Sequence, residues 1–211
     1  MEEKIAEQAK LSERVVLEDG FGDIKRVAGV DSAYLGERVV SGVVLMEHGQ
    51  VVEEVHAWKE FALPYKPTFL MFTEGPSMVE AVKKLSAKPD LLFVDGHGIA
   101  HPRGAGLACY VGVVTGIPTI GIAKELLVGE YTEPKREGES ELLLLDEKPI
   151  GWVVKTREGK RSIFVSPGNK VSVGSSLELA LKFVEDGKLP EPLELAHRYA
   201  NRVREHVKAK R

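Results

Sequence analysis

The alternation of apolar and polar residues divides the beginning of the chain into one helix and three strands. Residues 3–17 carry apolar side chains at helical spacing, which predicts an amphipathic helix. The run 26-RVAGVDSAYLG-36 predicts a strand. Two β-branched runs joined through His48-Gly49 predict a hairpin over residues 38–61. The apolar positions assigned to the helix are Ile5, Ala9, Val15 and Val16.

Short helices are expected next. Residues 68–74 have a helical pattern, and Gly75-Pro76 is expected to end that helix. Ser77 and Glu80 have the spacing of a capping box, which predicts a second helix over residues 77–85.

The rest of the chain is predicted to alternate between strands and helices. The apolar runs 90–95 and 117–124 are typical of strands buried on both faces, with a helix over residues 104–115 between them. The other expected elements are a hairpin over residues 141–159 with its turn at Glu147-Lys148, a strand over residues 162–169, and helices over residues 172–186 and 191–208. This order predicts one α/β domain over residues 1–211, with a mixed sheet flanked by helices.

Composition narrows the class of protein. The 211 residues are 43% hydrophobic and 29% charged, enough for a core, and the net charge of −3 argues against binding nucleic acid by bulk charge. No run of 18 apolar residues and no signal peptide are found, so we expect a cytoplasmic protein without a membrane partner. Cys109 is the only cysteine, which excludes a disulfide within the chain. Few asparagines and glutamines beside many Glu and Lys residues suggest a thermophilic source.

Two acids occupy positions where a carboxylate is costly. Asp31 lies in the apolar run 27-VAGVD-31, and Asp95 ends the run 91-LLFVD-95. A buried carboxylate must be neutralised, paired or bound to a metal. If the two strands are neighbours, both acids meet at one place, where Mg²⁺ would relieve their repulsion and suit phosphoryl transfer. The alternative is that both acids cap turns at strand ends.

Other polar side chains allow more than one interpretation. Glu74 is a third candidate acid or a solvated helix end. His97 and His101 have the HxxxH spacing of a helical zinc site, but they follow a strand and no glutamate follows His97, which favours loop histidines near phosphate. His197 could be a histidine on the surface of the last helix.

The stretch 64-PYKP-67 places an aromatic ring between prolines. Pro64 and Pro67 restrict φ and stiffen the loop. Tyr65 could therefore be a wedge between stacked bases, or it could pack on its own loop.

A set of motifs, in order along nearly the whole chain, resembles the endonuclease V family of deoxyinosine-directed repair nucleases. Most of the motifs are weak alone, but the set is highly specific. The motifs are 28-AGVDSAY-34, 64-PYKP-67, 72-FTEGP-76, 94-VDGHGIAHPRG-104, 116-GIPTIGIAK-124, 164-FVSPGN-169 and 190-PEPLELAH-197.

The resemblance implies an RNase H-like fold, in which three antiparallel strands precede parallel β-α-β units. It implies a Mg²⁺-dependent endonuclease, with Mn²⁺ able to substitute, that acts on DNA containing deoxyinosine or another deaminated base. The expected cut is at the second phosphodiester bond on the 3′ side of the lesion, leaving 3′-hydroxyl and 5′-phosphate ends. A monomer is expected.

The resemblance also implies roles for the polar residues of the acidic centre. Asp31 and Asp95 would hold the metal, and Glu74 would complete the centre through water or as a further ligand. His197 would lie at the metal–water site. Lys124, at a strand end, would steady phosphate charge.

The remaining implied roles concern DNA. Tyr65, held by Pro64 and Pro67, would fill the gap left by a flipped base. A glycine-rich loop would border the base pocket, and local basic groups would contact the backbone. The loop residues are Gly96, His97, Gly98 and His101, and the basic groups are Arg103, Lys124, Lys155, Arg157, Lys160 and Arg161.

The chain departs from the family pattern at two positions that concern local contacts to DNA. Asn169 stands where a histidine is usual, and Gly174 stands where an acid is common. Three other functions remain as alternatives: a catalytically idle binder of inosine-containing nucleic acid, a ribonuclease directed at inosine in RNA, and a metallohydrolase of small molecules that uses His97 and His101.

Overall fold

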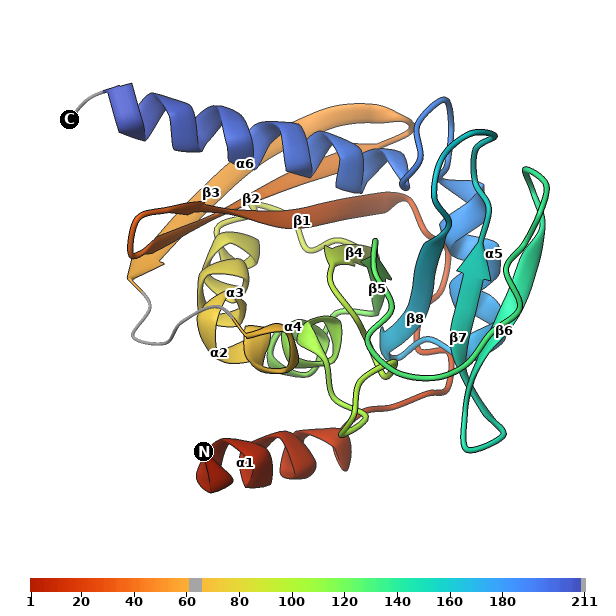
Figure 1. The fold of residues 1–211 in the computed structure, drawn as a ribbon. Coiled ribbons are helices and arrows are strands. Elements are labelled where there is room, and N and C mark those ends of the chain that lie inside the picture. Colours follow the sequence, from red (N-terminus) through yellow and green to blue (C-terminus); the bar gives the residue numbers. More distant parts are fainter. Residues whose placement is uncertain (61–65, 210–211) are drawn as a thin grey trace.

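The computed structural model describes residues 1–60 and 66–209 (Figure 1). The strands form one mixed sheet in the order β3-β2-β1-β4-β5-β8-β7-β6. The strands are β1 (Arg26–Leu35), β2 (Arg38–Glu47), β3 (Gln50–Glu60), β4 (Leu91–Asp95), β5 (Thr119–Ala123), β6 (Ser140–Leu145), β7 (Lys148–Val154) and β8 (Ile163–Asn169). The helices are α1 (Glu2–Ser12), the 3₁₀ helix η1 (Pro67–Phe69), α2 (Leu70–Thr73), α3 (Gly75–Lys83), α4 (Leu107–Thr115), α5 (Val173–Lys182) and α6 (Glu191–Ala209).

The pairing of the central strands confirms the predicted mixed topology. Strands β1, β2 and β3 form an antiparallel meander, whereas β4 pairs parallel with both β1 and β5. Strand β8 then returns antiparallel to β5. The parallel strands β1, β4 and β5 therefore end at the same edge of the sheet.

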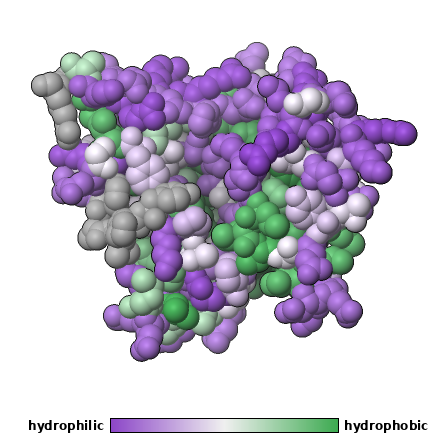
Figure 2. All heavy atoms as spheres, viewed as in Figure 1, coloured by the Kyte–Doolittle hydropathy of each residue, from purple (hydrophilic) through white to green (hydrophobic). Residues whose placement is uncertain are grey.

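Helices cover both faces of the sheet. On one face α5 and α6 bury an apolar cluster that includes Phe93, Ile122 and Leu193. On the other face α3 and α4 bury a second cluster that includes Val94, Met78 and Val111 (Figure 1). The space-filling view is mostly hydrophilic, with an apolar patch near the middle of that face (Figure 2).

The hairpin over β2 and β3 forms as predicted. His48 and Gly49 form its turn with φ of 52° and 75°, the left-handed conformation that a tight hairpin requires. The second hairpin also forms, but its turn lies at Asp146-Glu147 and not at Glu147-Lys148, because Lys148 already pairs with Leu145.

The first helix is shorter than predicted, and its buried side is different. Helix α1 ends at Ser12, and Ile5 and Ala9 are exposed, whereas Gln8 and Leu11 are buried. The chain leaves the helix because Val16 bonds to the end of β8: its amide donates to Asn169 Oδ1 at 3.0 Å. Tertiary hydrogen bonds thus outweigh the helical pattern beyond Ser12.

The predicted capping box is wrong. Helix α3 begins at Gly75 with Pro76 in its first turn, a position where proline's missing N–H costs nothing. The hydroxyl of Ser77 instead donates to carbonyl oxygens of β2 and β3, and Glu80 pairs with Lys59. Gly75-Pro76 starts the second helix and does not merely end the first.

None of the helices described is long and apolar enough to cross a membrane. Two other predicted helices are also shorter than their patterns, since α4 starts at Leu107 and α5 ends at Lys182, whereas α6 over Glu191–Ala209 matches its predicted range of 191–208. The predicted strand over residues 162–169 is strand from Ile163 to Asn169, including the Ser-Pro-Gly stretch.

Candidate active site

The two central acids lie side by side because of strand register. Val30 pairs with Val94, so the next residues, Asp31 in β1 and Asp95 at the end of β4, are also neighbours. Asp31 is only 5% exposed. The prediction that neighbouring strands bring both acids together is confirmed.

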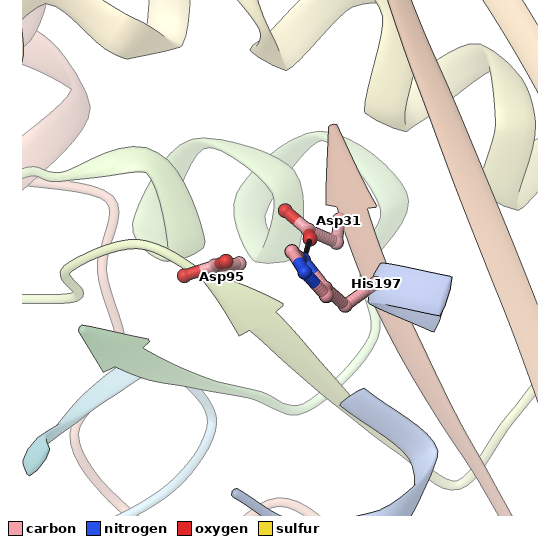
Figure 3. Close-up of side chains that lie close together, drawn as sticks. All are labelled: Asp31, Asp95 and His197. Carbon is pink, nitrogen blue, oxygen red and sulfur yellow. Dashed lines mark hydrogen bonds and ion pairs between the residues drawn. The ribbon is translucent and has the colours of Figure 1, made fainter. Parts of the chain in front are cut away.

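His197 reaches the acids from α6. Its Nδ1 lies 2.5 Å from Asp31 Oδ2, and ligand atoms of Asp31, Asp95 and His197 all lie within 4.8 Å of one another (Figure 3). The interpretation of His197 as an ordinary surface histidine is therefore wrong: although its side chain is half exposed, it points to a buried carboxylate.

Glycines in the sheet allow α6 to approach this closely. A Cβ added at Gly29 in β1 would overlap the carbonyl of Pro192 and lie 2.6 Å from the amide nitrogen of Leu193. A Cβ at Gly42 in β2 would lie 2.9 Å from the amide nitrogen of Ala200. The absence of side chains at these positions lets the helix backbone rest on the sheet and sets the position of His197.

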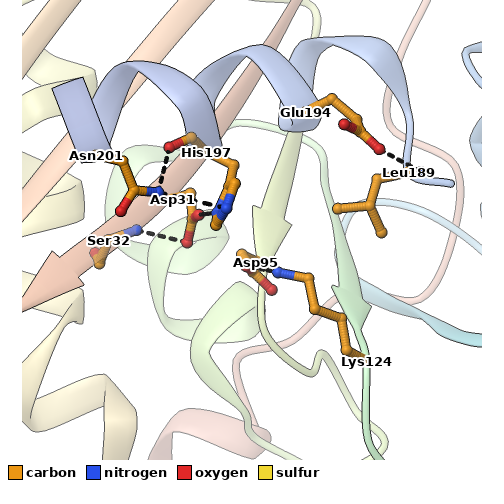
Figure 4. A network of polar contacts seen from close by, with 8 residues as sticks. All are labelled: Asp31, Ser32, Asp95, Lys124, Leu189, Glu194, His197 and Asn201. Atoms are coloured by element: carbon orange, nitrogen blue, oxygen red, sulfur yellow. Dashed lines mark hydrogen bonds and ion pairs between the residues drawn. The ribbon is translucent and has the colours of Figure 1, made fainter. Parts of the chain in front are cut away.

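Hydrogen bonds hold Asp31 and His197 in place. The amide of Ser32 donates to Asp31 Oδ1 at 2.6 Å, and Asn201 Nδ2 donates to the backbone oxygen of His197 at 2.8 Å (Figure 4). The hydrogen bond with Asp31 raises the pKa of His197 above its ordinary value.

Asp95 pairs with a lysine from the next strand. Lys124, which follows β5, donates from Nζ to Asp95 Oδ2 at 2.7 Å (Figure 4). Burial and repulsion from Asp31 nevertheless raise the pKa of Asp95 to about 7. Burial alone would lower the pKa of Lys124, but attraction to Asp95 raises it, so the lysine is positively charged.

Glu74 lies near the acids but is not one of the three converging groups. It occupies the junction of α2 and α3, and Tyr34 donates to its Oε1 at 2.6 Å. Burial, together with the charges of Asp31 and Asp95, raises the pKa of Glu74 to about 8, although the hydrogen bond from Tyr34 acts to lower it. The alternative of a solvated helix end is wrong, because Glu74 is buried.

Tyr34 is a site residue that the sequence reasoning missed. It lines the same cavity as the acids. Its signal was the final position of the motif 28-AGVDSAY-34, on the same strand as Asp31.

A cavity of about 480 Å³ opens beside the acids. It brings together many of the predicted site residues and a set of apolar side chains from α2, α4 and the loop after β5. The predicted site residues in its lining are Asp31, Pro67, Glu74, Asp95, Gly96, His97, His101 and Lys124, and the apolar ones include Leu70, Met71, Leu107, Leu126 and Leu127. Pro64 and Tyr65 lie outside the residues that the structure describes.

Two residues predicted to contact DNA, Gly98 and Arg103, do not line the cavity. The amide of Gly98 donates to Oγ of Ser166, a residue of β8, at 2.9 Å. Arg103 donates from Nε to Gln8 Oε1 at 2.6 Å and from Nη2 to the Thr68 carbonyl at 2.9 Å. These contacts give Gly98 and Arg103 structural partners within the protein.

The two loop histidines do not form a zinc pair. His97 Nε2 lies 2.9 Å from the carbonyl of Glu125, and His101 Nε2 lies 3.1 Å from that of Thr68. Burial lowers the pKa of each to about 4, so both rings are neutral at pH 7. Within the described ranges, the group able to hold a metal is Asp31, Asp95 and His197, which disfavours the metallohydrolase alternative.

The donor set of this group fits a divalent cation. The two carboxylates are oxygen ligands that Mg²⁺ or Mn²⁺ accepts, and a cation would lower the high pKa of Asp95 by offsetting its repulsion from Asp31. The paired strands β1 and β4 already hold these two carboxylates close together.

The two departures from the family pattern lie apart from the acids. Asn169 is buried and pairs with Thr119, at the end of β5 opposite to Lys124. Gly174 lies on α5, and an added Cβ there would meet nothing within 4 Å.

A β1–β3 meander followed by β4 and β5, with acids at the facing positions of β1 and β4, defines an RNase H-like protein with a candidate metal centre. The chain belongs to the endonuclease V family, whose model matches residues 9–198.

Individual comparisons agree with this family. Endonuclease V of Dictyoglomus turgidum is 41% identical over 205 residues, which are 96% of this chain and 90% of that protein. The crystal structure of endonuclease V from Streptomyces avermitilis matches 98% of this chain and 94% of its own, with a TM-score of 0.90 and 34% identity. Endonuclease V of Ciona intestinalis, in complex with a 24-mer DNA containing an inosine followed by a ribo-adenosine, shares the fold with a TM-score of 0.78 and 23% identity, over 98% of this chain and 100% of its own.

Proposed function

We propose that this chain is a deoxyribonuclease that recognises deoxyinosine and other deaminated bases in DNA. It hydrolyses the second phosphodiester bond on the 3′ side of the lesion and leaves 3′-hydroxyl and 5′-phosphate ends. The observation that carries the proposal is the convergence of Asp31, Asp95 and His197 beside a cavity in a member of the endonuclease V family. The inosine-containing DNA in the complex of the Ciona intestinalis protein supports the substrate.

Asp31 and Asp95 would hold the metal, which we propose is Mg²⁺, with Mn²⁺ able to replace it. When bound, the ion polarises the phosphate and lowers the pKa of water. Asp31 accepts a hydrogen bond from Ser32 and pairs with His197, and these contacts fix its orientation. We propose that His197 keeps its proton on Nδ1, because this proton is shared with the carboxylate of Asp31.

Lys124 and Glu74 act around this centre. Lys124 keeps its positive charge beside Asp95 and stabilises negative charge that develops on the phosphate. Glu74 holds a proton at neutral pH when the site is free of metal, because its carboxyl is buried beside two other acids. We propose that it completes the centre once a cation offsets that repulsion.

The cavity is the proposed site of the flipped base. Its apolar lining suits a purine ring, and the backbone at Gly96, with φ of 145°, adopts a conformation that favours glycine. Tyr65 is proposed to fill the gap in the duplex, on the argument from its sequence alone.

We also propose that residues 1–211 act as one domain and as a monomer. One sheet connects the described strands, and one chain supplies every group of the candidate centre.

The test is a cleavage assay on a labelled duplex with a single deoxyinosine. We expect one nick, at the second bond 3′ to the lesion, in Mg²⁺ or Mn²⁺ and none in EDTA or on the matched adenine duplex. Binding without a nick would favour the catalytically idle binder. A nick only in a matched RNA substrate would favour the ribonuclease.

A further inference from the structure

A second groove adjoins the candidate active site. Its volume is about 560 Å³, and it lies between the segment after β5 and the connection from β7 to β8. Lys124, Glu125 and Leu126 line both this groove and the cavity beside the acids, so the two form a continuous surface. We call it the basic groove, and its other lining residues are Tyr131, Glu133, Lys155, Gly159, Lys160, Arg161, Ser162 and Phe164.

The basic groove has an excess of positive charge in an acidic protein. Four cations line it against two acids, a net charge of +2, whereas the whole chain has −3. The acids are already engaged: Glu125 accepts from Arg161 at 2.7 Å, and Glu133 accepts from Ser162 at 2.6 Å. The cations are Lys124, Lys155, Lys160 and Arg161.

The pKa of Lys188 is consistent with the positive charge of the groove. Burial, and then repulsion from Lys124 and Arg161, lower the pKa of Lys188. By contrast, two basic groups expected from the sequence to contact DNA do not line the groove: Arg103 bonds to Gln8, and Arg157 bonds to the carbonyl of Asp186 and pairs with Glu137. Of the basic residues predicted to contact DNA, the four that line this one groove are Lys124, Lys155, Lys160 and Arg161.

An aromatic ring stands in the same groove. Tyr131 is 38% exposed, and its ring meets that of Phe164 edge to face with centroids 5.4 Å apart. The buried Phe164 fixes one edge of the tyrosine and leaves part of the ring accessible. Cationic side chains beside an aromatic ring are the combination that binds a nucleic-acid strand through its phosphates and one stacked base.

We propose that the basic groove binds the cleaved strand where it continues beyond the acidic centre. Backbone phosphates contact Lys155, Lys160 and Arg161, and a base stacks on Tyr131. Lys124 joins this path to the scissile phosphate, because it lines the groove and donates to Asp95. The inference rests on the proposed nuclease function, since it makes the groove part of the same substrate's path.

The first test measures the affinity of single-stranded DNA as a function of salt. The groove variant combines Lys160→Gln and Arg161→Gln in one protein. A matched control combines Lys83→Gln and Lys208→Gln. The four residues are exposed, and both variants remove the same charge. The groove variant should reduce the slope of log affinity against log salt by about 1 to 2, whereas the control should leave it unchanged. Equal slopes in the two variants would overturn the proposal.

The second test locates the strand. Single-turnover cleavage is followed on inosine substrates that are truncated stepwise on either side of the lesion. On the full-length substrate, the groove variant should need about tenfold more enzyme for half-maximal rate. Truncation on one side should abolish this difference, and truncation on the other should not. A difference that survives both truncations contradicts the proposed path.

Tyr131 gives an independent readout. Tyr131→Ala should weaken DNA binding roughly 5- to 150-fold, whereas Tyr131→Phe should bind within about twofold of the parent protein, because the ring provides the stacking. If Phe is as damaging as Ala, base stacking is the wrong explanation. If the parent protein cuts no inosine substrate, the proposed function fails, and the salt slopes still decide whether the groove binds DNA.

Discussion

Asp31 and Asp95 illustrate how single residues define the candidate site, because the two carboxylates lie close together, with Asp31 buried and Asp95 partly exposed. Asp95→Asn should therefore lower the rate of cleavage by at least about 10³, on the scale of charge stabilisation at a metal centre. The fold should persist, because the change removes repulsion from Asp31. Single-turnover cleavage and circular dichroism measure the two effects. Asp90→Asn is the control, since Asp90 precedes the other end of β4 and accepts from the backbone amides of Lys25 and Arg26. Near-native turnover by Asp95→Asn would contradict the metal assignment.

The raised pKa of Glu74 predicts how the stability of the protein depends on pH. Burial raises its pKa in the folded state to about 8, from an ordinary value of 4.5. The folded protein keeps a proton that the unfolded chain has lost between these values. The raised pKa of Glu74 therefore contributes to the free energy of unfolding. The contribution is fully present below about pH 4.5 and is lost as the pH rises through 8.

Glu74→Gln should therefore flatten the decline in stability of the metal-free protein between pH 5 and 8, by on the order of a few kcal/mol. Denaturant unfolding in EDTA at several pH values gives the measurement. Part of the decline should remain, because the pKa of Asp95 is also raised, to about 7. Glu3→Gln, on the exposed side of α1, is the control. The same decline in both variants would show that Glu74 is not the titrating group.

At the scale of elements, the position of His197 depends on how α6 rests on β1. Gly29→Ala adds a methyl group where the backbone of Pro192 and Leu193 already lies. We expect a loss of about 1–3 kcal/mol in stability from overpacking, and a loss of cleavage although all acids remain. Thermal unfolding and the cleavage assay test this expectation.

Gly174→Ala is the matched control for the helix contact. Its Cβ would meet nothing within 4 Å, on helix α5. This variant should be neutral or more stable by up to about 1 kcal/mol, because alanine favours a helix over glycine. If Gly29→Ala behaves in the same way, the close approach of α6 does not position the site.

At the scale of the whole molecule, we expect metal binding to stabilise the folded protein. Mg²⁺ or Mn²⁺ should raise the melting temperature, because a ligand that binds only the folded state stabilises it by about 2.7 kcal/mol at 100 times its Kd. Differential scanning calorimetry with and without the ion measures the shift. Asp95→Asn should respond far less, and an equal shift in both proteins would place the cation at another site.

The sequence by itself determined most of the elements and the set of candidate polar residues. Strands β1 and β4 were readable because continuous apolar runs have few alternatives to a buried strand, and an acid inside such a run has few structural uses. The ordered motifs pointed to the endonuclease V family, and the family comparison confirmed it. Local patterns failed where distant partners compete, as at Ser77, whose hydroxyl bonds to β2 and β3, and at Ser12, where the chain leaves its helix.

Only the tertiary structure decided which polar groups meet. The register of Val30 with Val94 sets Asp31 beside Asp95. The close approach of α6 at Gly29 places His197 next to Asp31. The same folding pairs Arg103 with Gln8, a contact that its sequence context did not predict. Hydrophobic patterns act along the chain over a few residues, whereas convergence of side chains depends on strand pairing and close packing between segments far apart in sequence. The candidate polar residues and the meeting of Asp31 with Asp95 could therefore be predicted from the sequence, but the contacts of His197 and Arg103 could not.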